Sequence, residues 1–470
     1  MTAYDNLRYN NLANPNTHPG RLFVLAKLAG LNPAPLDTCR VLELGTSEGT
    51  NLIGMAVAMP QASFTGVDLA QLPIERGNAL LAKLKLSNVA LQTGDLLELG
   101  AEFRDRHGPF DYILTHGIYG WTPPQVGEKV LELARLCLAP DGVAFVSYNT
   151  LPAGHIRQMV RDMMLYQTGG IDDPQERLKS AREFLAILAL GRPEPEYFDA
   201  AAADYAATLL KHSDSALFHD DLAPLYQPVH FHDFIDRAAV HGLQYCGEAT
   251  GYNPPRNLKK EAIEAARQNS GGNFIREQQY LDFLRMRGFR QTLLCHQEIA
   301  VKHDWSPSDI AGCFAHTTAV EVTEHNFTSA DNTRMSTSHP VPVALMRRLI
   351  DARPRSIQVT TEDAPVALEL FKVGVIELRG EPSIAKAGAP GESQYPVASP
   401  LARQQIEMGE SVVTTLWHRP LEIADDQSRQ ALLLLDGTRN RETLSRALEC
   451  SRDVLDAEVA TLGRLSLLVE

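Results

Sequence analysis

The sequence predicts an α/β fold in which a doubly wound sheet carries a helical insertion and precedes a C-terminal winged-helix-like domain. Between Arg40 and Tyr148, short β-rich runs alternate with segments whose apolar residues recur at helical spacing. After residue 152 this alternation stops for a long, mostly helical stretch and then resumes. Alternating β and α units predict a parallel sheet, and the interruption predicts an insertion into it.

Five strands and three connecting helices are expected in the first 150 residues. The strand candidates are Arg40–Leu44, Ser63–Val67, Val89–Thr93, Phe110–His116 and Gly142–Tyr148. The helix candidates are Asn51–Met59, Pro73–Leu86 and Pro123–Leu138, the last of which begins with two prolines that fit a helix start.

The middle of the chain is expected to leave the sheet and return to it. Residues 152–226 contain Ala-rich and acidic helical segments and predict a lid. Phe231–Ala239 indicates a helix, and Leu243–Ala249 and Phe289–His296 indicate the last two strands. We expect these strands to form an antiparallel edge hairpin, with a helical excursion over Leu258–Arg287 between them.

The C-terminal third shows a faint duplication. Helical stretches at Val341–Ala352 and Ser428–Leu435 each precede more helix and then a β-like run, at Gly374–Leu378 and Leu465–Val469 respectively. This pattern predicts two small winged-helix-like units. Gly380–Pro400 is rich in Gly, Pro, Ala and Ser and predicts a flexible linker between them.

A chain of 470 residues exceeds the size of one hydrophobic core, so several domains are expected. We expect an N-terminal helical cap over residues 1–37 and a ligand-binding core over 38–305 that includes the insertion at 152–226. A linker is expected over 306–336 and the winged-helix-like domain over 337–470.

The composition narrows the possible classes of protein. The formal net charge of −14 argues against nucleic acid as a partner, because phosphate binding needs clustered Lys and Arg. No apolar run reaches the roughly 18 residues of a membrane span, and the N-terminus lacks the apolar stretch of a secretory signal. The six cysteines form no CxxC pair and are expected to be reduced core residues of a cytoplasmic protein.

No metal site is expected. Histidines gather at His230 and His232, with His219 and His241 nearby. Alternate residues can share one face, but no third ligand follows at a spacing typical of a metal site.

A glycine-bearing loop after the first strand is the main candidate binding motif. Gly45 permits a sharp turn against which a ligand can lie, and Gly49 permits close approach at the start of the next helix. The spacing is G-x-x-x-G, and Ser47 stands where a dinucleotide-binding loop would carry its middle glycine. Glu43, just before the turn, suits a ligand with an ammonium and a sulfonium rather than a pyrophosphate. A βα turn that binds no ligand is the alternative.

Two further acids end the second and third strands. Asp68 is placed to accept both hydroxyls of a ribose, which alone would equally suit NAD. Asp95 is placed to accept an adenine amino group, and Leu69 and Leu96 are placed to sandwich the ring. Three acids that close three successive strands are difficult to explain as solvated strand ends.

The loop after the fourth strand is where an acceptor is expected, because ligands in this topology sit at the carboxyl ends of the strands. Tyr119 and Trp121 could flank an amine or face a sulfonium, with packing under the next helix as the alternative. His116 could act as a base or contact the amino-acid part of the donor, with a purely structural hydrogen bond as the alternative.

Together these motifs resemble the class I methyltransferases that carry a methyltransferase regulatory domain, and among them the bacterial outer-membrane-protein lysine methyltransferases. The likeness covers nearly the whole chain. Its specific segments include Tyr4-Asp5, Thr17-His18-Pro19, Glu43-Leu-Gly45, Gly49, Asn51, Gly66-Val-Asp68, Gly94-Asp95, His116-Gly-Ile-Tyr119-Gly-Trp121, Pro228-Val-His-Phe231-His232 and Phe289-Arg-Gln-Thr-Leu-Leu-Cys295. Glu48 and Thr50 depart from the small residues expected in the loop.

The resemblance implies a Rossmann-like class I methyltransferase sheet with S-adenosylmethionine as donor. It implies a donor site that includes Asn51 and an acceptor that is a protein or peptide lysine. A methyltransferase for a small metabolite and a non-catalytic S-adenosylmethionine-binding regulator remain alternatives. A homodimer is among the possible partners. Removal of residues from Thr337 onward is expected to leave donor binding intact.

Overall fold

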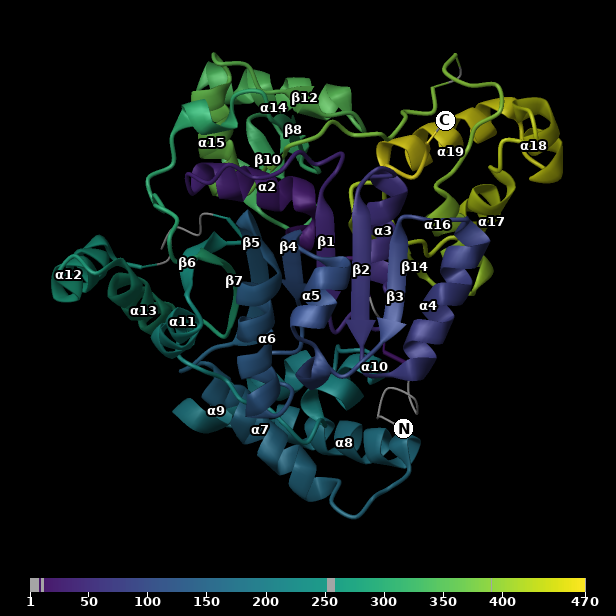
Figure 1. The fold of residues 1–470 in the computed structure, drawn as a ribbon. Coiled ribbons are helices and arrows are strands. Elements are labelled where there is room, and N and C mark those ends of the chain that lie inside the picture. The colour runs from purple at the N-terminus through teal and green to yellow at the C-terminus, as the bar shows by residue number, and fades with distance from the viewer. Residues whose placement is uncertain (1–7, 10–11, 252–257, 390, 470) are drawn as a thin grey trace.

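The computed structural model describes residues 8–9, 12–251, 258–389 and 391–469 of the chain (Figure 1). The pair Tyr4-Asp5 and the first seven residues of the expected cap lie outside the described residues.

A seven-stranded sheet forms the centre of the molecule, in the order β3-β2-β1-β4-β5-β7-β6. Strands β1 to β5 are parallel, whereas β7 is antiparallel to both β5 and β6. This confirms the predicted edge hairpin and the Rossmann-like α/β class. The strands are β1 (Arg40–Leu44), β2 (Ser63–Asp68), β3 (Val89–Thr93), β4 (Phe110–Thr115), β5 (Leu138–Asn149), β6 (Leu243–Glu248) and β7 (Phe289–His296).

Helices cover both faces of the sheet because successive strand residues point to opposite sides. Val41 belongs to one core cluster and its neighbour Leu42 to the other. The first face packs against α2 (Pro19–Leu28), α3 (Thr50–Ala58) and α4 (Gln71–Leu84). The second face packs against α5 (Ala101–His107), α6 (Pro124–Cys137) and α11 (Phe231–Val240).

The insertion has a small core of its own and lies beyond the carboxyl ends of the strands (Figure 1). Its elements are α7 (Gly154–Gln167), α8 (Pro174–Ala189), α9 (Tyr197–Leu209), α10 (Asp214–Ala216) and the short η3 (Leu217–Asp221). Because the insertion faces this edge of the sheet, it can form one wall of a ligand site there.

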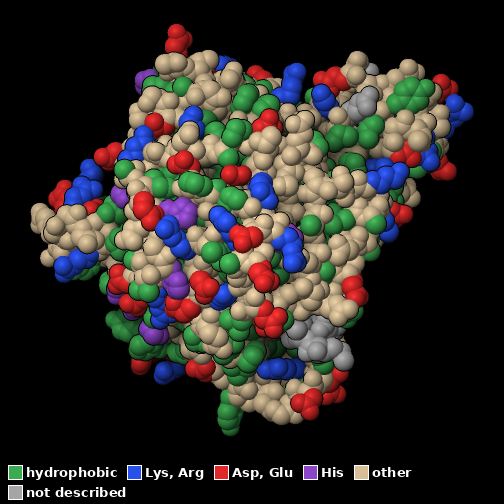
Figure 2. Space-filling model, in the orientation of Figure 1, with side chains coloured by type: hydrophobic (Ala, Val, Ile, Leu, Met, Phe, Trp, Pro, Cys, Tyr) green, Lys and Arg blue, Asp and Glu red, His purple; other side chains and the backbone are tan. Residues whose placement is uncertain are grey.

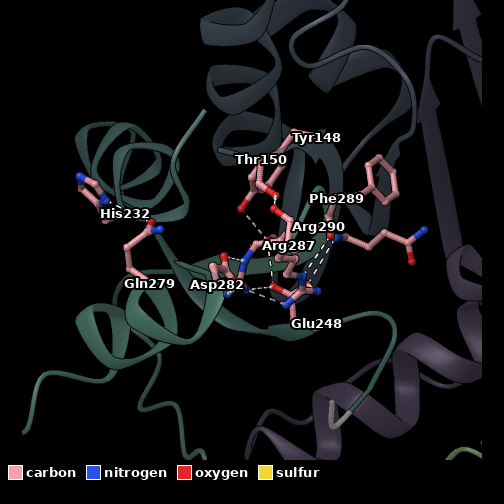
Figure 3. A network of polar contacts seen from close by, with 11 residues as sticks. Tyr148, Thr150, His232, Glu248, Gln279, Asp282, Arg287, Phe289 and Arg290 are labelled. Atoms are coloured by element: carbon pink, nitrogen blue, oxygen red, sulfur yellow. Dashed lines mark hydrogen bonds and ion pairs between the residues drawn. The ribbon is translucent and has the colours of Figure 1, made fainter. Parts of the chain in front are cut away.

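A buried ionic network holds the edge hairpin to α13 (Phe274–Arg285), which with α12 (Lys260–Ser270) forms the predicted excursion (Figure 3). The Arg290 guanidinium is fully buried and donates two hydrogen bonds to Asp282, at 2.7 and 2.9 Å, and one to Glu248 at 2.5 Å. Arg287 donates to Glu248 from the other side at 3.0 Å. Arg290 also lies 3.7 Å from the ring centre of Phe231 on α11.

The C-terminal third departs from the sequence prediction in two places. The linker expected at 306–336 is wrong, because this segment carries η4 (Pro307–Ile310), β8 (Phe314–His316), β9 (Val320–Thr323), β10 (Asn326–Thr328) and β11 (Arg334–Ser336). Strand β8 pairs with β12 (Ile357–Gln358) and β13 (Glu377–Arg379), and α14 (Pro340–Ala352) and α15 (Ala364–Val373) complete a first module.

The segment expected as a flexible linker, Gly380–Pro400, is packed in its described part. Arg441 is buried and donates hydrogen bonds to the carbonyl oxygens of Gly388, Ala389 and Ser393. A second module follows, with α16 (Pro400–Glu407), β14 (Val412–Thr414), β15 (Pro420–Glu422), α17 (Asp426–Leu434), α18 (Arg441–Ala447) and α19 (Arg452–Arg464). The strand expected at Leu465–Val469 is reduced to one bridge between Leu468 and Ala398.

The first module shares one hydrophobic core with the sheet. The same cluster of buried side chains runs from Leu22 on α2 through Val41 on β1 to Leu368 on α15. Helix α2 therefore links the sheet to the C-terminal half of the chain. No helix in the described ranges combines the length and apolar character of a membrane span.

Candidate functional site

The site lies where the strand order reverses, between β1 and β4. Leu44 and Thr115 are paired at the ends of these strands, so Gly45 and His116 follow at the same edge. In open α/β sheets this crevice is the usual ligand position. The structure therefore brings the predicted donor loop and the predicted acceptor loop side by side.

The donor loop has the backbone that its glycines predict. Gly45 and Gly49 have φ of +79° and +71°, a region that favours glycine. Ser47 also has a positive φ of 51°, at the place where other nucleotide-binding loops use glycine. A Cβ on Gly45 would lie 2.2 Å from the Cδ1 of Ile118, so the Ile118 side chain occupies the space above the bare backbone. The sequence prediction did not single out Ile118.

Glu43 is buried at the base of this loop. Thr46 donates its hydroxyl to one carboxylate oxygen at 2.8 Å, and Asn51 donates its amide to the other at 2.7 Å. Burial raises the pKa of Glu43 to about 7, against the opposing effect of these two hydrogen bonds. The charge of the loop is therefore sensitive to pH near neutrality.

Asp68 and Asp95 lie at adjacent strand ends, as predicted. Asp68 accepts hydrogen bonds from the backbone N–H groups of Ser47, at 2.7 Å, and Ala70, at 2.9 Å, which fixes its carboxylate against the donor loop. Asp95 follows β3 and accepts from the N–H of Leu97 at 2.9 Å. A carboxylate has about four lone-pair positions, so Asp95 retains capacity for a ligand beside its contact with Leu97.

The two leucines predicted to sandwich an adenine ring are placed differently. Leu69 is 60% exposed and available to a ring, whereas Leu96 is buried in the core on the α6 side. Of the two, Leu69 alone is exposed enough to contact an adenine ring.

His116 is exposed at the mouth of the crevice, but protein surrounds much of its ring. The rings of Phe145 and Phe289 lie 6.1 and 6.3 Å from it, centre to centre. Desolvation lowers the pKa of His116 to about 4. The ring is therefore neutral at pH 7 and too weak a base to take a proton from an ammonium group.

Tyr119 is a correction to the sequence prediction. Its side chain is only 3% exposed and packs edge-on against the rings of Tyr148, at 5.9 Å, and Phe234, at 5.0 Å. Its hydroxyl accepts a 3.4 Å hydrogen bond from Arg237 on α11. A ring held in the core beneath α11 cannot flank an acceptor. Tyr119 therefore has the structural packing role that was the alternative interpretation of this residue.

Trp121 fastens the acceptor loop to the insertion. Its ring packs against Tyr226 at 5.2 Å, and the guanidinium groups of Arg157 and Arg161 lie 4.8 and 5.8 Å from its centre. The neighbouring Gly120 carbonyl accepts a hydrogen bond from the N–H of Gln227 at 2.7 Å. Trp121 thus positions the insertion relative to the site.

The C-terminal module reaches the donor loop directly, which the sequence prediction missed. The Nε2 of His418 lies 2.8 Å from the Oδ1 of Asn51. Asn51 also accepts from the Asn14 N–H at 3.0 Å and exchanges hydrogen bonds with the Thr17 hydroxyl. One side chain therefore joins the cap, the donor loop and the C-terminal module. The resemblance named Asn51 and Thr17, but no local motif marks His418.

Glu48, the unusual residue of the loop, is buried in an ion cluster. Arg8 donates two hydrogen bonds to it, at 2.9 and 2.8 Å, and Arg76 donates one at 2.7 Å. Arg8 also pairs with Glu410 of the C-terminal module at 2.5 Å. The departure from a small residue thus adds a second link between the loop and the rest of the chain.

No group of three or more His, Cys, Asp or Glu side chains with a metal-binding arrangement occurs among the described residues. On the face shown in Figure 2, acidic and basic side chains are interspersed rather than gathered into a single basic field.

Three family models match the chain. A model described as "Methyltransferase domain" matches residues 36–186, and one described as "Predicted methyltransferase regulatory domain" matches 213–296. A third, described as "PKMT, C-terminal winged helix domain", matches residues 394–454.

Relatives extend the likeness beyond these segments. An uncharacterised protein of Rickettsia prowazekii is 32% identical over 238 residues, which cover 50% of this chain and 93% of that protein. A second uncharacterised protein of the same organism is 32% identical over 312 residues, which cover 65% of this chain and about half (55%) of that relative's length. The structure of PKMT2 from Rickettsia typhi matches with a TM-score of 0.83 and 24% identity over 98% of this chain and all of that one, and it has also been solved with AdoHcy.

The sheet, the donor loop and these matches define a class. The chain belongs to the S-adenosylmethionine-dependent methyltransferases that carry a methyltransferase regulatory domain, and it shares the whole-chain fold of PKMT2.

Proposed function

We propose that this chain is a cytoplasmic protein lysine N-methyltransferase. The observation that carries the proposal is the contact of the donor loop with a C-terminal module of the PKMT type, through Asn51 and His418. A module that lies beyond the donor sheet and reaches the donor loop adds surface for a large acceptor beside the site. The likeness to PKMT2 over 98% of the chain supports the same assignment.

The residues at the strand ends fit S-adenosylmethionine. Gly45 and Gly49 leave bare backbone for the methionine part, and Glu43 supplies a negative charge for its ammonium group. Asp68 would hold the ribose and Asp95 the adenine. Bound there, the donor supplies a methyl group that its sulfonium has already activated.

The acceptor amine must be neutral to attack that methyl group. The lysine ammonium therefore releases one proton to water before the amine becomes a nucleophile, and the methylated product releases another if it is to react again. His116 is a neutral hydrogen-bonding wall in this arrangement rather than the base, because its pKa is about 4. Trp121 and the insertion exclude water and align the amine.

Transfer of a labelled methyl group to protein is the direct test. We expect label in lysine side chains of a protein acceptor, identified by mass spectrometry after incubation with a lysate of the source cell. Asp68→Ala should weaken S-adenosylhomocysteine binding by ~1.5–3 kcal/mol and lower labelling in parallel when the donor concentration is near the wild-type dissociation constant. Label found only in small molecules would replace the lysine assignment with a metabolite methyltransferase. Donor binding without any labelling would indicate a non-catalytic S-adenosylmethionine-binding regulator.

A homodimer through the insertion is part of the proposal. Five large apolar side chains on and beside its helices are highly exposed, and we infer that they contribute to one apolar contact surface. They are Tyr166 (90%), Ile187 (67%), Leu190 (83%), Tyr197 (93%) and Phe198 (81%). Light scattering should give twice the mass of the chain, and Phe198→Glu together with Leu190→Glu should return it to the monomer value.

A further inference from the structure

A polar cavity of about 710 Å³ lies apart from the donor loop, between α2, the end of β6 and the first C-terminal module. Its volume falls in the range of small-molecule sites. Four cationic and two acidic side chains line it: Arg21, Arg285, Lys372 and Arg419, with Asp331 and Glu377. A positive cavity is a local exception in a chain with a net charge of −14.

Arg21 is the unusual member of this set. It is 92% buried, since only 8% of its surface is exposed. Its Nε donates a 2.7 Å hydrogen bond to the carbonyl oxygen of Ala249, and its guanidinium lies 5.4 Å from the ring centre of Phe371. These two contacts fix the plane of the guanidinium. Among the described residues, no carboxylate pairs with Arg21 and nothing hydrogen-bonds to its two terminal nitrogens.

The acids in the cavity are already engaged by other groups. Glu377 pairs with Arg419, and Asp331 accepts a hydrogen bond from the hydroxyl of Ser329. Burial and the nearby charges of Arg419 and Arg379 lower the pKa of Arg21 to about 10, so it remains cationic at pH 7. Buried charges in proteins are normally paired, but among the described residues Arg21 has no hydrogen-bonded carboxylate, and only the charge of Asp331 opposes this lowering of its pKa.

We propose that this cavity binds a small-molecule oxyanion, a carboxylate or phosphate group, on the two terminal nitrogens of Arg21. A planar guanidinium with a free edge matches the two oxygens of such a group. The hydroxyl-bearing side chains of Thr318 and Thr333 line the same space and can donate to further oxygens. This site is distinct from the donor site and does not depend on the proposed acceptor.

Calorimetric titration of the full-length protein with inorganic phosphate, and separately with citrate, at constant ionic strength tests the proposal. We expect saturable binding of at least one of the two, and the pair of titrations distinguishes a phosphate ligand from a carboxylate ligand. Arg21→Gln should weaken that binding at least tenfold, and Arg21→Lys should give an intermediate loss because it keeps the charge without the fork. Arg347→Gln, at an exposed ion pair with Glu321, should bind as the wild type does.

Unchanged affinity in a folded Arg21→Gln, or no binding of either anion to the wild type, would overturn the proposal. Donor-analogue binding reports whether the variant is folded. If Arg21→Gln does not fold, crystals of the wild type soaked in tungstate decide the question. An anomalous peak within hydrogen-bonding distance of Arg21 is expected, and tungstate bound only elsewhere refutes the site.

Discussion

His418 and Asn51 are hydrogen-bonded at 2.8 Å although 367 residues separate them in the sequence. The Oδ1 of Asn51 can only accept, so the Nε2 of His418 carries the proton, and its buried Nδ1 has no hydrogen-bond partner among the described residues. Burial lowers the pKa of His418 to about 3, which keeps the ring neutral. The other end of the Asn51 amide donates to Glu43 at 2.7 Å. The C-terminal module thereby orients the amide that holds the acid of the donor loop.

His418 should therefore act as a positioning residue for donor binding. We expect His418→Ala to raise the dissociation constant of S-adenosylhomocysteine by roughly five- to tenfold, because one buried hydrogen bond is worth about 1–1.5 kcal/mol. His418→Gln, whose amide can also donate, should restore much of the affinity. His155→Ala, at an exposed histidine of the insertion, is the matched control. If His418→Ala melts earlier but binds the donor analogue normally, the role is structural only.

Removal of residues 337–470 should weaken donor binding, contrary to the expectation from sequence. The truncation removes His418 and Glu410, and it exposes apolar side chains of α2 such as Leu22 that now share a core with α15. We expect calorimetry with S-adenosylhomocysteine to give a markedly higher dissociation constant for the shortened chain. An unchanged constant would show that the cap and the loop keep their geometry without the module.

Donor affinity should depend on pH through Glu43, whose pKa is about 7. Above this pH its carboxylate is charged and attracts the donor ammonium, so affinity should be highest near pH 8 and fall as the pH decreases below 7. The stability of the ligand-free protein should depend on pH in the opposite sense. Because folding raises the pKa of Glu43, this group stabilises the folded state fully at pH values below its unfolded-state pKa, near 4.5. The stabilisation is lost as the pH rises through 7. Glu43→Gln should flatten both profiles, measured by calorimetry and by thermal unfolding.

The ionic network around Arg290 should dominate the stability of the edge hairpin (Figure 3). Asp282→Asn keeps the shape of the side chain but leaves the buried Arg290 with only the carboxylate that it shares with Arg287. Breaking a buried pair typically costs roughly 3–5 kcal/mol, so the melting temperature should fall by several degrees. Glu442→Gln, in an exposed helical pair with Arg446, should be nearly neutral. Equal melting of the two variants would contradict this reading.

Within the same network, Glu248 contributes acid sensitivity, whereas burial raises the pKa of Asp282 and acts in the opposite sense. Burial would raise the pKa of Glu248, but Arg290 and Arg287 outweigh it and hold the pKa below its ordinary value. A carboxyl group whose pKa is lowered by folding stabilises the folded state fully at pH values above its unfolded-state pKa. This stabilisation is lost as the pH falls through the folded-state pKa.

Periodicity and glycine chemistry predicted much of the sheet and the donor loop, since both are local properties of the sequence. The three-residue strands at Phe314–His316 and Asn326–Thr328 are too short for alternation to be detected, so their segment looked like a linker. The contact between His418 and Asn51 depends on packing between distant parts of the chain and leaves no local signal. Tyr119 and Trp121 are only two residues apart in an irregular loop, where no period indicates which ring enters the core.

Trp121 should matter for acceptor turnover rather than for donor binding. Its ring is held between Tyr226 and two arginines of the insertion, of which Arg157 is anchored by a 2.7 Å ion pair with the buried Asp221. Each cation–π contact is worth ~0.5–2 kcal/mol, so Trp121→Ala removes a large part of what holds the insertion over the site. We expect kcat with a protein acceptor to fall at least tenfold, while the dissociation constant of S-adenosylhomocysteine changes less than twofold. Trp121→Phe should retain part of the activity because it keeps a ring.

Tyr119 provides the matched comparison from the same loop. Tyr119→Phe keeps the buried ring and loses only the long contact to Arg237, so its turnover should stay near the wild-type value. Tyr119→Ala should instead lower stability by roughly 3–5 kcal/mol, since it empties a core position. Labelled-methyl transfer, read beside donor binding and thermal unfolding for each variant, separates these outcomes. If Trp121→Ala turns over a protein acceptor as fast as the wild type does, the insertion does not align the acceptor. A loss of turnover in Tyr119→Phe would return the Tyr119 hydroxyl to the list of candidate catalytic groups.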